Sequence, residues 1–534
     1  MINKKIPLLV LGLDSLPPDL TQKMAQNGTM PFLHELITKG SFGPLKSVIP
    51  ANTGAAWNSA WTGLKPDKHG YFGFYHYDFK DDTIHISTSD RLKAPTFWEI
   101  LNSYGLKTLV INSPMQFPAT PLNGIMVSGF MTPSLDSPCV YPEDFRREIA
   151  REIPDYVFDV RWNKDKDDLA AFEQNIQAVV SAFEQRVRVS KLAAARTAWE
   201  VLAVVFKSVD NMLHYAWEYL DESQKHPERH KLTLRALRIL DNCCRELALM
   251  AGYPDVNILI CSDHGHGPIK GHLFVNRLLA EWSLLRPQNR IRRSWSKFLN
   301  SCRKRLGAER KKKKPSAHIG RRFNIQWHKS RAVMIGSGVI YLNVKGRQPE
   351  GLVEPSQYQS LRESIAERLR SLQDPATSSP MILTVECPPQ AGPEPVPEGQ
   401  VVVPDILFEP ADGVVLRSTT TKGPYWHKGY PDNLRGCHRM DGIVLAAGPA
   451  FARNQLVEGK LYDIAPTILA ACGISMPNGL DGKIIEKILN DRPQVITSEN
   501  KMPLTKDTVV FERTYNKDEE NIIINRLSDL GYLE

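Results

Sequence analysis

The sequence lacks any apolar stretch of the roughly 20 residues needed to cross a lipid bilayer. Its first apolar run, residues 6–13, follows Lys4 and Lys5 as in a secretion signal, but it stops at Asp14 without a small-residue cleavage site. The eight cysteines are scattered and form no Cys-x-x-Cys pair, a usage that fits a reducing compartment. We therefore expect a cytoplasmic protein whose first apolar run is a buried strand.

The chain has no excess of basic charge outside a single segment, although its net charge is +8. Residues 286–332 contain 17 Lys or Arg and one acidic residue, Glu309, while the rest of the chain has 50 basic and 58 acidic residues. The positive charge therefore belongs to one surface segment. Nothing in the chain resembles a base-reading motif, so no sequence-specific contact with nucleic acid is expected.

Within residues 286–314, apolar side chains recur at helical spacing between basic ones, which predicts a basic amphipathic helix. Such a helix can pack its apolar stripe on the protein and leave its Lys and Arg in solvent. It can also lie on an anionic membrane surface or attract an anionic substrate or polyanion. The apolar positions are Ile291, Trp295, Phe298, Leu299, Cys302 and Leu306.

The first 275 residues alternate short β-rich runs with longer helical patterns, which predicts a mainly parallel α/β sheet covered by helices on both faces. With 534 residues, 42% of them hydrophobic, the chain can bury a large core. Strands are expected at 8–13, 107–112, 201–209 and 257–261, and helices from near Pro17, at 53–61 and at 97–103.

The pattern changes after residue 275. We expect residues 1–275 to form the first part of the catalytic core and residues 276–400 to be an inserted cap, with a strand pair at 333–344 and a helix at 357–372. Residues 401–490 would return to the core, with a strand at 405–408, His438 in a loop and a helix at 463–472. Residues 491–534 are expected to be a tail that docks on the core through a short helix near its end.

Acidic and imidazole side chains follow the expected strands, where parallel strands bring their carboxyl ends to one edge of the sheet. Residues about 200 positions apart can therefore share one crevice. Carboxylate oxygen and imidazole nitrogen together suit zinc, manganese or iron better than calcium or magnesium, and six such groups are enough for two ions. The six are Asp14, Asp210, His214, Asp263, His264 and His438.

Local spacing supports this hypothesis at two places. Asp210 and His214 are four residues apart, so both can face one ion if the chain is helical there. Thr53 stands at an expected helix start, where unpaired backbone N–H groups and the helix dipole favour an anion such as phosphate. A threonine in this position also commonly serves only as a helix cap.

These motifs resemble the alkaline phosphatase superfamily, in its type I phosphodiesterase/nucleotide pyrophosphatase branch. They are most similar to the soluble proteins described as AlkP-superfamily phosphohydrolase/phosphomutase. The similar segments cover nearly the whole chain in the family's order, so the resemblance is specific for fold and metal site and weak for substrate. They are residues 11–14, 30–33, 62–70, 262–265, 436–442 and 463–469.

The resemblance implies a two-metal phosphohydrolase that cleaves phosphodiester or pyrophosphate bonds of a small-molecule substrate. Thr53 would be the nucleophile and would form a phosphothreonine, and the two divalent ions would be zinc, with manganese as the alternative. The implied ligands are Asp14, Asp263, His264 and the Thr53 oxygen for one ion, and Asp210, His214 and His438 for the other.

Three further residues are candidates for substrate binding. Asn112, at a strand end, could donate to a phosphate oxygen, and Lys46 and Arg439 could neutralise substrate charge. Two alternatives stay open, a phosphomutase or phosphomonoesterase of the same superfamily and an inactive binding module tethered to an anionic surface. A sulfatase is disfavoured because residues 52–56 lack the Cys/Ser-x-Pro-x-Arg pattern. The oligomeric state is left open.

Overall fold

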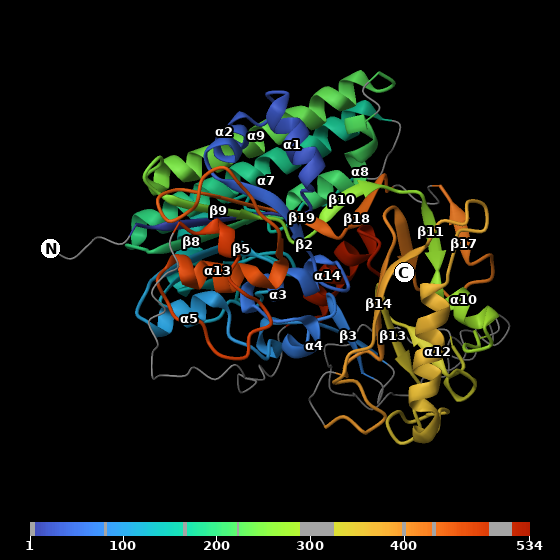
Figure 1. Ribbon diagram of the computed structural model, residues 1–534. Helices are drawn as coiled ribbons and strands as arrows, with labels where there is room; N and C mark the ends of the chain where they lie inside the picture. Colours follow the sequence, from blue (N-terminus) through green and yellow to red (C-terminus); the bar gives the residue numbers. More distant parts are fainter. Residues whose placement is uncertain are drawn as a thin grey trace, which may run out of the picture.

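A computed structural model describes residues 6–78, 83–163, 168–221, 224–288, 325–397, 402–429, 434–490 and 515–533. Its centre is a ten-stranded sheet with helices on both faces, which confirms the predicted α/β class (Figure 1). The strand order is β20-β2-β19-β9-β1-β8-β5-β6-β7, with β21 beside β2. The strands are β1 (Leu8–Leu13), β2 (Ser41–Lys46), β5 (Thr108–Ser113), β6 (Gly124–Ser128), β7 (Val140–Tyr141), β8 (Val201–Phe206), β9 (Asn257–Cys261), β19 (Asp441–Ala447), β20 (Gln455–Leu456) and β21 (Gly459–Lys460).

The central strands β9, β1, β8, β5 and β6 run parallel to one another. All six residues of β1 are buried, as its unbroken apolar sequence requires of a strand covered on both faces. Leu13 at the end of β1 is in register with Phe206 at the end of β8. The residues that follow these strands therefore lie at the same edge of the sheet.

Two helical layers cover the sheet (Figure 1). Alternate residues of β1 face them, so that Leu9 and Leu11 belong to one apolar core and Leu8 and Val10 to the other. The first layer consists of α1 (Pro18–Gln26), α2 (Pro31–Lys39), α7 (Leu169–Arg196), α8 (Ser208–Asp221) and α9 (Pro227–Ala251). The second layer consists of α3 (Thr53–Thr62), α4 (Pro66–His69), α5 (Phe97–Ser103) and α13 (Ile464–Ala471).

A second lobe lies beside the sheet, at the right of Figure 1. It contains one four-stranded sheet, β12-β13-β15-β14, and one three-stranded sheet, β16-β11-β17. The predicted division of the chain into core, cap and tail stays a prediction. The elements are β11 (Gly271–Phe274), α10 (Val275–Glu281), β12 (Ala332–Met334), β13 (Val339–Leu342), α12 (Tyr358–Arg370), β14 (Ile382–Glu386), β15 (Ile406–Pro410), β16 (Val414–Arg417) and β17 (Trp426–Lys428).

Two short two-stranded sheets and a terminal helix complete the part that positions the site. β10 (Gly265–Pro268) pairs with β18 (Gly436–Arg439), and β3 (Tyr75–Asp78) pairs with β4 (Thr83–Ile86). The chain from residue 515 onward forms α14 (Lys517–Asp529), which is longer than the short helix that the sequence predicted.

Two predictions about local structure were wrong. The strand expected at 201–209 ends at Phe206, and Val209 is a buried residue of α8. Its apolar side chain belongs to a helical repeat that continues with Met212 and Leu213, which are also buried. His438 lies in β18 and not in a loop. The four residues of β18 show no apolar alternation, and they form a strand because they pair with β10.

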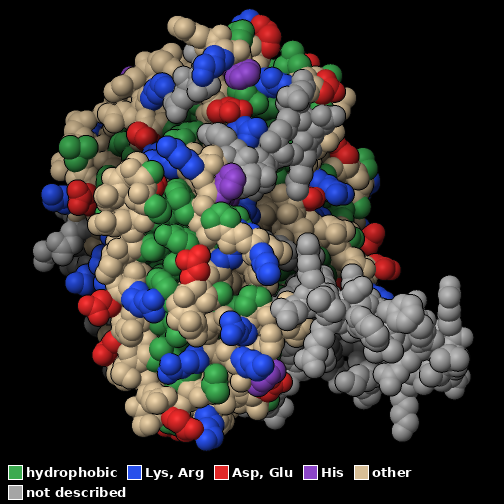
Figure 2. Space-filling model, turned by 90° about the vertical axis from the view of Figure 1, so that its right-hand side faces the viewer, with side chains coloured by type: hydrophobic (Ala, Val, Ile, Leu, Met, Phe, Trp, Pro, Cys, Tyr) green, Lys and Arg blue, Asp and Glu red, His purple; other side chains and the backbone are tan. Residues whose placement is uncertain are grey.

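The basic amphipathic helix predicted for residues 286–314 falls almost entirely outside the described residues. On the face of the molecule seen in Figure 2, Lys and Arg side chains are interspersed with Asp and Glu. Within the described ranges, no helix has both the length and the apolar character that a membrane span requires.

Candidate active site

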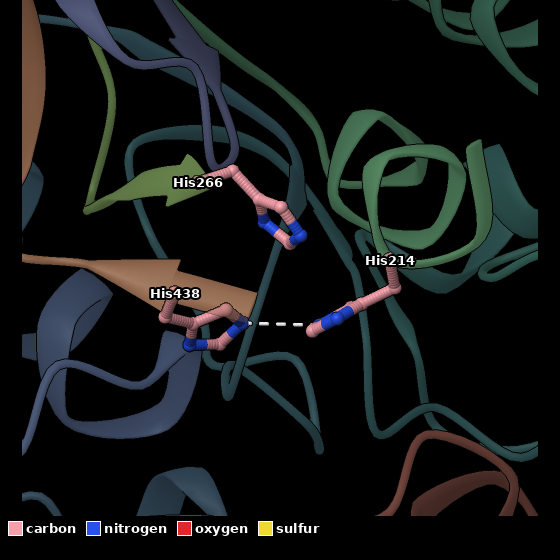
Figure 3. Close-up of side chains that lie close together, drawn as sticks. All are labelled: His214, His266 and His438. Carbon is pink, nitrogen blue, oxygen red and sulfur yellow. Dashed lines mark hydrogen bonds between the residues drawn. The ribbon is translucent and has the colours of Figure 1, made fainter. Parts of the chain in front are cut away.

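One group of candidate metal ligands joins α8 to β18. Asp210 and His214 stand one turn apart on α8, as their spacing predicted, and both face His438. The Asp210 Oδ1 atom is 3.3 Å from His214 Nε2 and 3.2 Å from His438 Nε2. The two Nε2 atoms are 3.1 Å apart (Figure 3).

The hydrogen bonds of these two imidazoles show what their inner nitrogens offer. His214 Nδ1 lies 3.0 Å from the Gly436 carbonyl, and His438 Nδ1 lies 2.9 Å from the Ala51 carbonyl. A carbonyl only accepts, so each Nδ1 carries a proton, and in the neutral imidazole the Nε2 atom presents a lone pair. Two lone pairs and the Asp210 carboxylate thus converge on one point, an arrangement that a divalent cation satisfies.

A second group surrounds Thr53 at the carboxyl ends of β1 and β9. His264 Nε2 lies 3.2 Å from Asp263 Oδ2, 4.0 Å from Asp14 Oδ1 and 3.5 Å from Thr53 Oγ1. The Trp57 indole donates to Asp14 Oδ2 over 2.8 Å and holds that carboxylate in place. All five side chains are buried. The structure brings these four candidate ligands together; their role as ligands stays a prediction.

Thr53 is the first residue of α3, and Asn52 caps this helix by accepting a hydrogen bond from the Ala55 N–H. Thr53 is therefore not the capping residue, which removes the alternative role for its hydroxyl. The hydroxyl lies at the helix N-terminus, where the dipole and the backbone N–H groups of the first turn favour a phosphate.

The electrostatics of the second group also fit a cation. Burial and the neighbouring carboxylates raise the pKa of Asp14 and of Asp263 well above the ordinary value for aspartate. Among the described residues, Asp14 Oδ1 and Asp210 Oδ2 accept no hydrogen bond. Burial lowers the pKa of His264 well below its ordinary value, which keeps the imidazole neutral and able to bind a metal.

Lys207 is a functional residue that the sequence prediction missed. Its ammonium group is buried 3.5 Å from Asp210 Oδ2 and 3.6 Å from Asp159 Oδ1, and it lies over the Phe130 ring. Burial alone would lower the pKa of Lys207, but Asp159, Asp210 and Asp14 raise it above the ordinary value. Burial likewise opposes ionisation of Asp210, yet His214 and Lys207 lower its pKa well below the ordinary value. Lys207 therefore contributes, together with His214, to keeping Asp210 ionised.

Ser15 was also missed, and His266 was expected at most to line the crevice and not among the metal ligands. The Ser15 hydroxyl lies 2.9 Å from Asp210 Oδ1 and 2.9 Å from His266 Nδ1, and the Ser15 N–H donates to Asp263 Oδ1 over 3.2 Å. Ser15 thus connects the two groups of ligands. His266 extends from β10 toward His214, with ring centres 4.6 Å apart (Figure 3). The sequence signal for Ser15 was its position next to Asp14. The sequence signal for His266 was the repeat of histidine at 264 and 266.

The three predicted substrate-binding residues are held by other partners or lie in solvent. Asn112 donates to the Val205 carbonyl over 3.0 Å, and Lys46 is exposed at the end of β2. Arg439 lies 3.6 Å from Asp19 and 3.8 Å from Asp412. Their role in substrate binding stays a prediction.

A cavity between the core and the second lobe opens onto the first group of ligands. Its wall combines aromatic rings with a few polar groups, as is usual for small-molecule sites. In the described part of the chain, its lining includes Asn52, Phe72, Phe74, Tyr75, Tyr77, His214, Tyr341, Glu409, Arg417, His438 and Tyr532.

Two groups of buried carboxylate and imidazole ligands beside one hydroxyl, at the carboxyl edge of an α/β sheet, define a metal-dependent phosphoryl-transfer hydrolase. The profile of the type I phosphodiesterase / nucleotide pyrophosphatase family matches residues 8–437. The chain belongs to this family, within the alkaline phosphatase superfamily, and is a phosphodiesterase/nucleotide pyrophosphatase-like hydrolase that depends on divalent metal.

One similar solved structure is that of human ectonucleotide pyrophosphatase/phosphodiesterase 5. It is 15% identical in sequence, with a TM-score of 0.47, and the match covers 91% of this chain and 100% of that chain. No curated protein sequence matches this chain.

Proposed function

We propose that this protein cleaves phosphodiester or pyrophosphate bonds in a phosphate-ester small molecule through a phosphothreonine formed on Thr53. The observation that carries the proposal is the placement of the Thr53 hydroxyl. It lies at the N-terminus of α3, 3.5 Å from His264 Nε2, and both neighbouring groups of side chains can hold a cation. The sequence prediction named the same nucleophile and the same six ligands.

We propose that both cations are zinc. Bound zinc would act as a Lewis acid and lower the pKa of the threonine hydroxyl. Mixed carboxylate and imidazole donors suit zinc and also manganese. The residues that would hold the first ion are Asp14, Asp263, His264 and Thr53, and those that would hold the second are Asp210, His214 and His438.

The residues of the chain perform two successive displacements at phosphorus. The Thr53 oxygen forms a bond to phosphorus and releases its proton to solvent, while the bond to the alcohol or phosphate leaving group breaks and that group departs with the bonding electron pair. Water then attacks phosphorus and the bond to Thr53 breaks, which releases the phosphoryl product and restores the hydroxyl. The first turn of α3 stabilises the phosphoryl oxygens in both steps.

The test of this proposal is the Thr53→Ala variant, assayed with bis-p-nitrophenyl phosphate after loading with zinc or manganese. Removal of the nucleophile should lower kcat by at least about a thousandfold. The metal content should stay near that of the wild type, because six other ligands remain. Thr62→Ala, at the other end of the same helix, is the matched control and should retain activity.

Rapid acid quenching followed by mass spectrometry should detect phosphate on the Thr53 peptide of the wild type. Undiminished turnover by Thr53→Ala would contradict the proposal. Turnover of p-nitrophenyl phosphate alone would indicate a phosphomonoesterase or mutase, and no turnover by the metal-loaded wild type would indicate a binding protein. Comparison of zinc and manganese loading identifies the active metal.

A further inference from the structure

Tyr532 comes from the far end of the described chain yet lines the cavity beside the candidate metal ligands. It follows α14, and its phenol oxygen lies 3.2 Å from His438 Nε2. The phenol also interacts with the Thr53 side chain. Its ring centre is 4.6 Å from that of Phe74, which is itself buried. Tyr532 thus stands between the proposed nucleophile and one proposed ligand.

The backbone around Tyr532 is held by several hydrogen bonds. The Tyr215 hydroxyl donates to the Asp529 carbonyl over 2.8 Å, and the Tyr75 hydroxyl donates to the Tyr532 carbonyl over 3.1 Å. On α14, Ile523 and Leu527 are completely buried in the main core. The tyrosine is therefore a fixed part of the cavity wall, although its side chain is partly exposed toward the cavity.

The hydrogen bonds of the two His438 ring nitrogens determine what the phenol does. His438 Nδ1 donates to the Ala51 carbonyl, so in the neutral imidazole Nε2 has a lone pair to which the Tyr532 O–H donates. That nitrogen has a single lone pair, which a bound cation would occupy. The phenol O–H would then need another acceptor in the same place.

We propose that Tyr532 is a catalytic residue that contacts the substrate and donates a hydrogen bond to a phosphoryl oxygen. The proposal deepens the proposed function and rests on it. The phenol contacts both the Thr53 side chain and His438 Nε2, so a phosphoryl group on Thr53 would lie beside it, and a phosphoryl oxygen would be the acceptor that replaces His438 Nε2. A hydrogen bond to an anionic oxygen is stronger than one between neutral groups.

The experiment compares metal-loaded wild type with Tyr532→Phe, which loses only the hydroxyl. Tyr215→Phe is the matched control, because it removes a hydroxyl that holds the same segment but does not line the cavity. Calorimetry measures the affinity for inorganic phosphate, and steady-state assays measure kcat/KM for bis-p-nitrophenyl phosphate. Metal content and melting temperature are recorded for all three proteins.

For Tyr532→Phe, we expect phosphate affinity and kcat/KM to fall by on the order of tenfold to a hundredfold, with unchanged metal content. Tyr215→Phe should keep both values near those of the wild type. The phosphate measurement tests Tyr532 even if the wild type cleaves no ester, so failure of this inference and failure of the proposed function are distinguishable.

Three results would overturn the inference. The first is wild-type phosphate affinity in Tyr532→Phe. The second is a loss of bound metal that accounts for its weaker phosphate binding, which would make Tyr532 a structural support of His438. The third is higher turnover in Tyr532→Ala than in the wild type, which would mean that the side chain obstructs the site.

Discussion

Glu409 is a buried carboxyl beside the segment that carries the proposed nucleophile. It lies on β15, lines the cavity and accepts a hydrogen bond of 2.9 Å from the Ala51 N–H, two residues before Thr53. Burial and, to a smaller extent, the Asp412 charge raise its pKa to about 8, against the opposing effect of the Ala51 N–H hydrogen bond. Near neutral pH, Glu409 is therefore mainly protonated in the folded protein.

This carboxyl makes folding stability depend on pH. Below its ordinary pKa of 4.5, Glu409 is neutral in both the folded and the unfolded chain. As the pH rises from 4.5 toward 8, only the unfolded chain releases the Glu409 proton. The contribution of Glu409 to the free energy of unfolding is therefore lost over this pH range. Glu409→Gln should therefore be more stable, relative to the wild type, at pH 8 than at pH 5.

Melting temperatures of both proteins at these two pH values measure the effect. Glu363→Gln, at an exposed position of α12, is the matched control. A difference between wild type and Glu409→Gln that does not change with pH would show that the carboxyl is not kept protonated by the fold.

At the scale of the element, α14 connects the core to the cavity wall. Leu527 is completely buried on this helix, whereas Ile522 on the same helix is 39% exposed. Leu527→Ala should lower the free energy of unfolding by about 2–5 kcal/mol, because it leaves a cavity in the core. Ile522→Ala is the control, with a much smaller expected loss, and urea denaturation measures both. Equal effects of the two substitutions would contradict the packing of α14.

The sequence predicted some elements to the residue and missed others for physical reasons. The strand at 257–261 and the helix at 97–103 were identified because each has a continuous apolar run or a clear helical repeat with turn residues at its ends. β18 was missed, since its four residues owe their conformation to pairing with β10 and not to their own pattern. Tertiary pairing of this kind leaves no local signal.

The residues of the candidate site likewise divide into those that the sequence predicted and those that it missed. Candidate ligands such as Asp210 and His214 are recognisable from their chemistry and spacing together with the family resemblance. Lys207 and Tyr532 are not, because their role depends on which residues the fold brings beside them. A lysine after a strand and a tyrosine near the end of a chain are unremarkable until the sheet order and the docking of α14 are known.

For the whole molecule, three buried carboxylates lie close together with the Lys207 ammonium group beside them. Cations that bind the folded chain in preference to the unfolded chain stabilise the folded chain by mass action. They also reduce the electrostatic repulsion among the three carboxylates. Removal of metal with a chelator should lower the melting temperature by on the order of several degrees, and added zinc or manganese should restore it.

Differential scanning fluorimetry checks this expectation. Asp263→Asn removes one of the repelling charges and one ligand, so its melting temperature should respond less to the chelator. A wild-type melting temperature that is the same with and without chelator would mean that the two groups of ligands hold no stabilising metal.

The position of Tyr532 has a consequence for synthesis of the protein. Asp14 is translated near the beginning of the chain, His438 hundreds of residues later, and Tyr532 later still. Tyr532 therefore emerges from the ribosome after every candidate metal ligand, so this part of the cavity wall is synthesised after all of them.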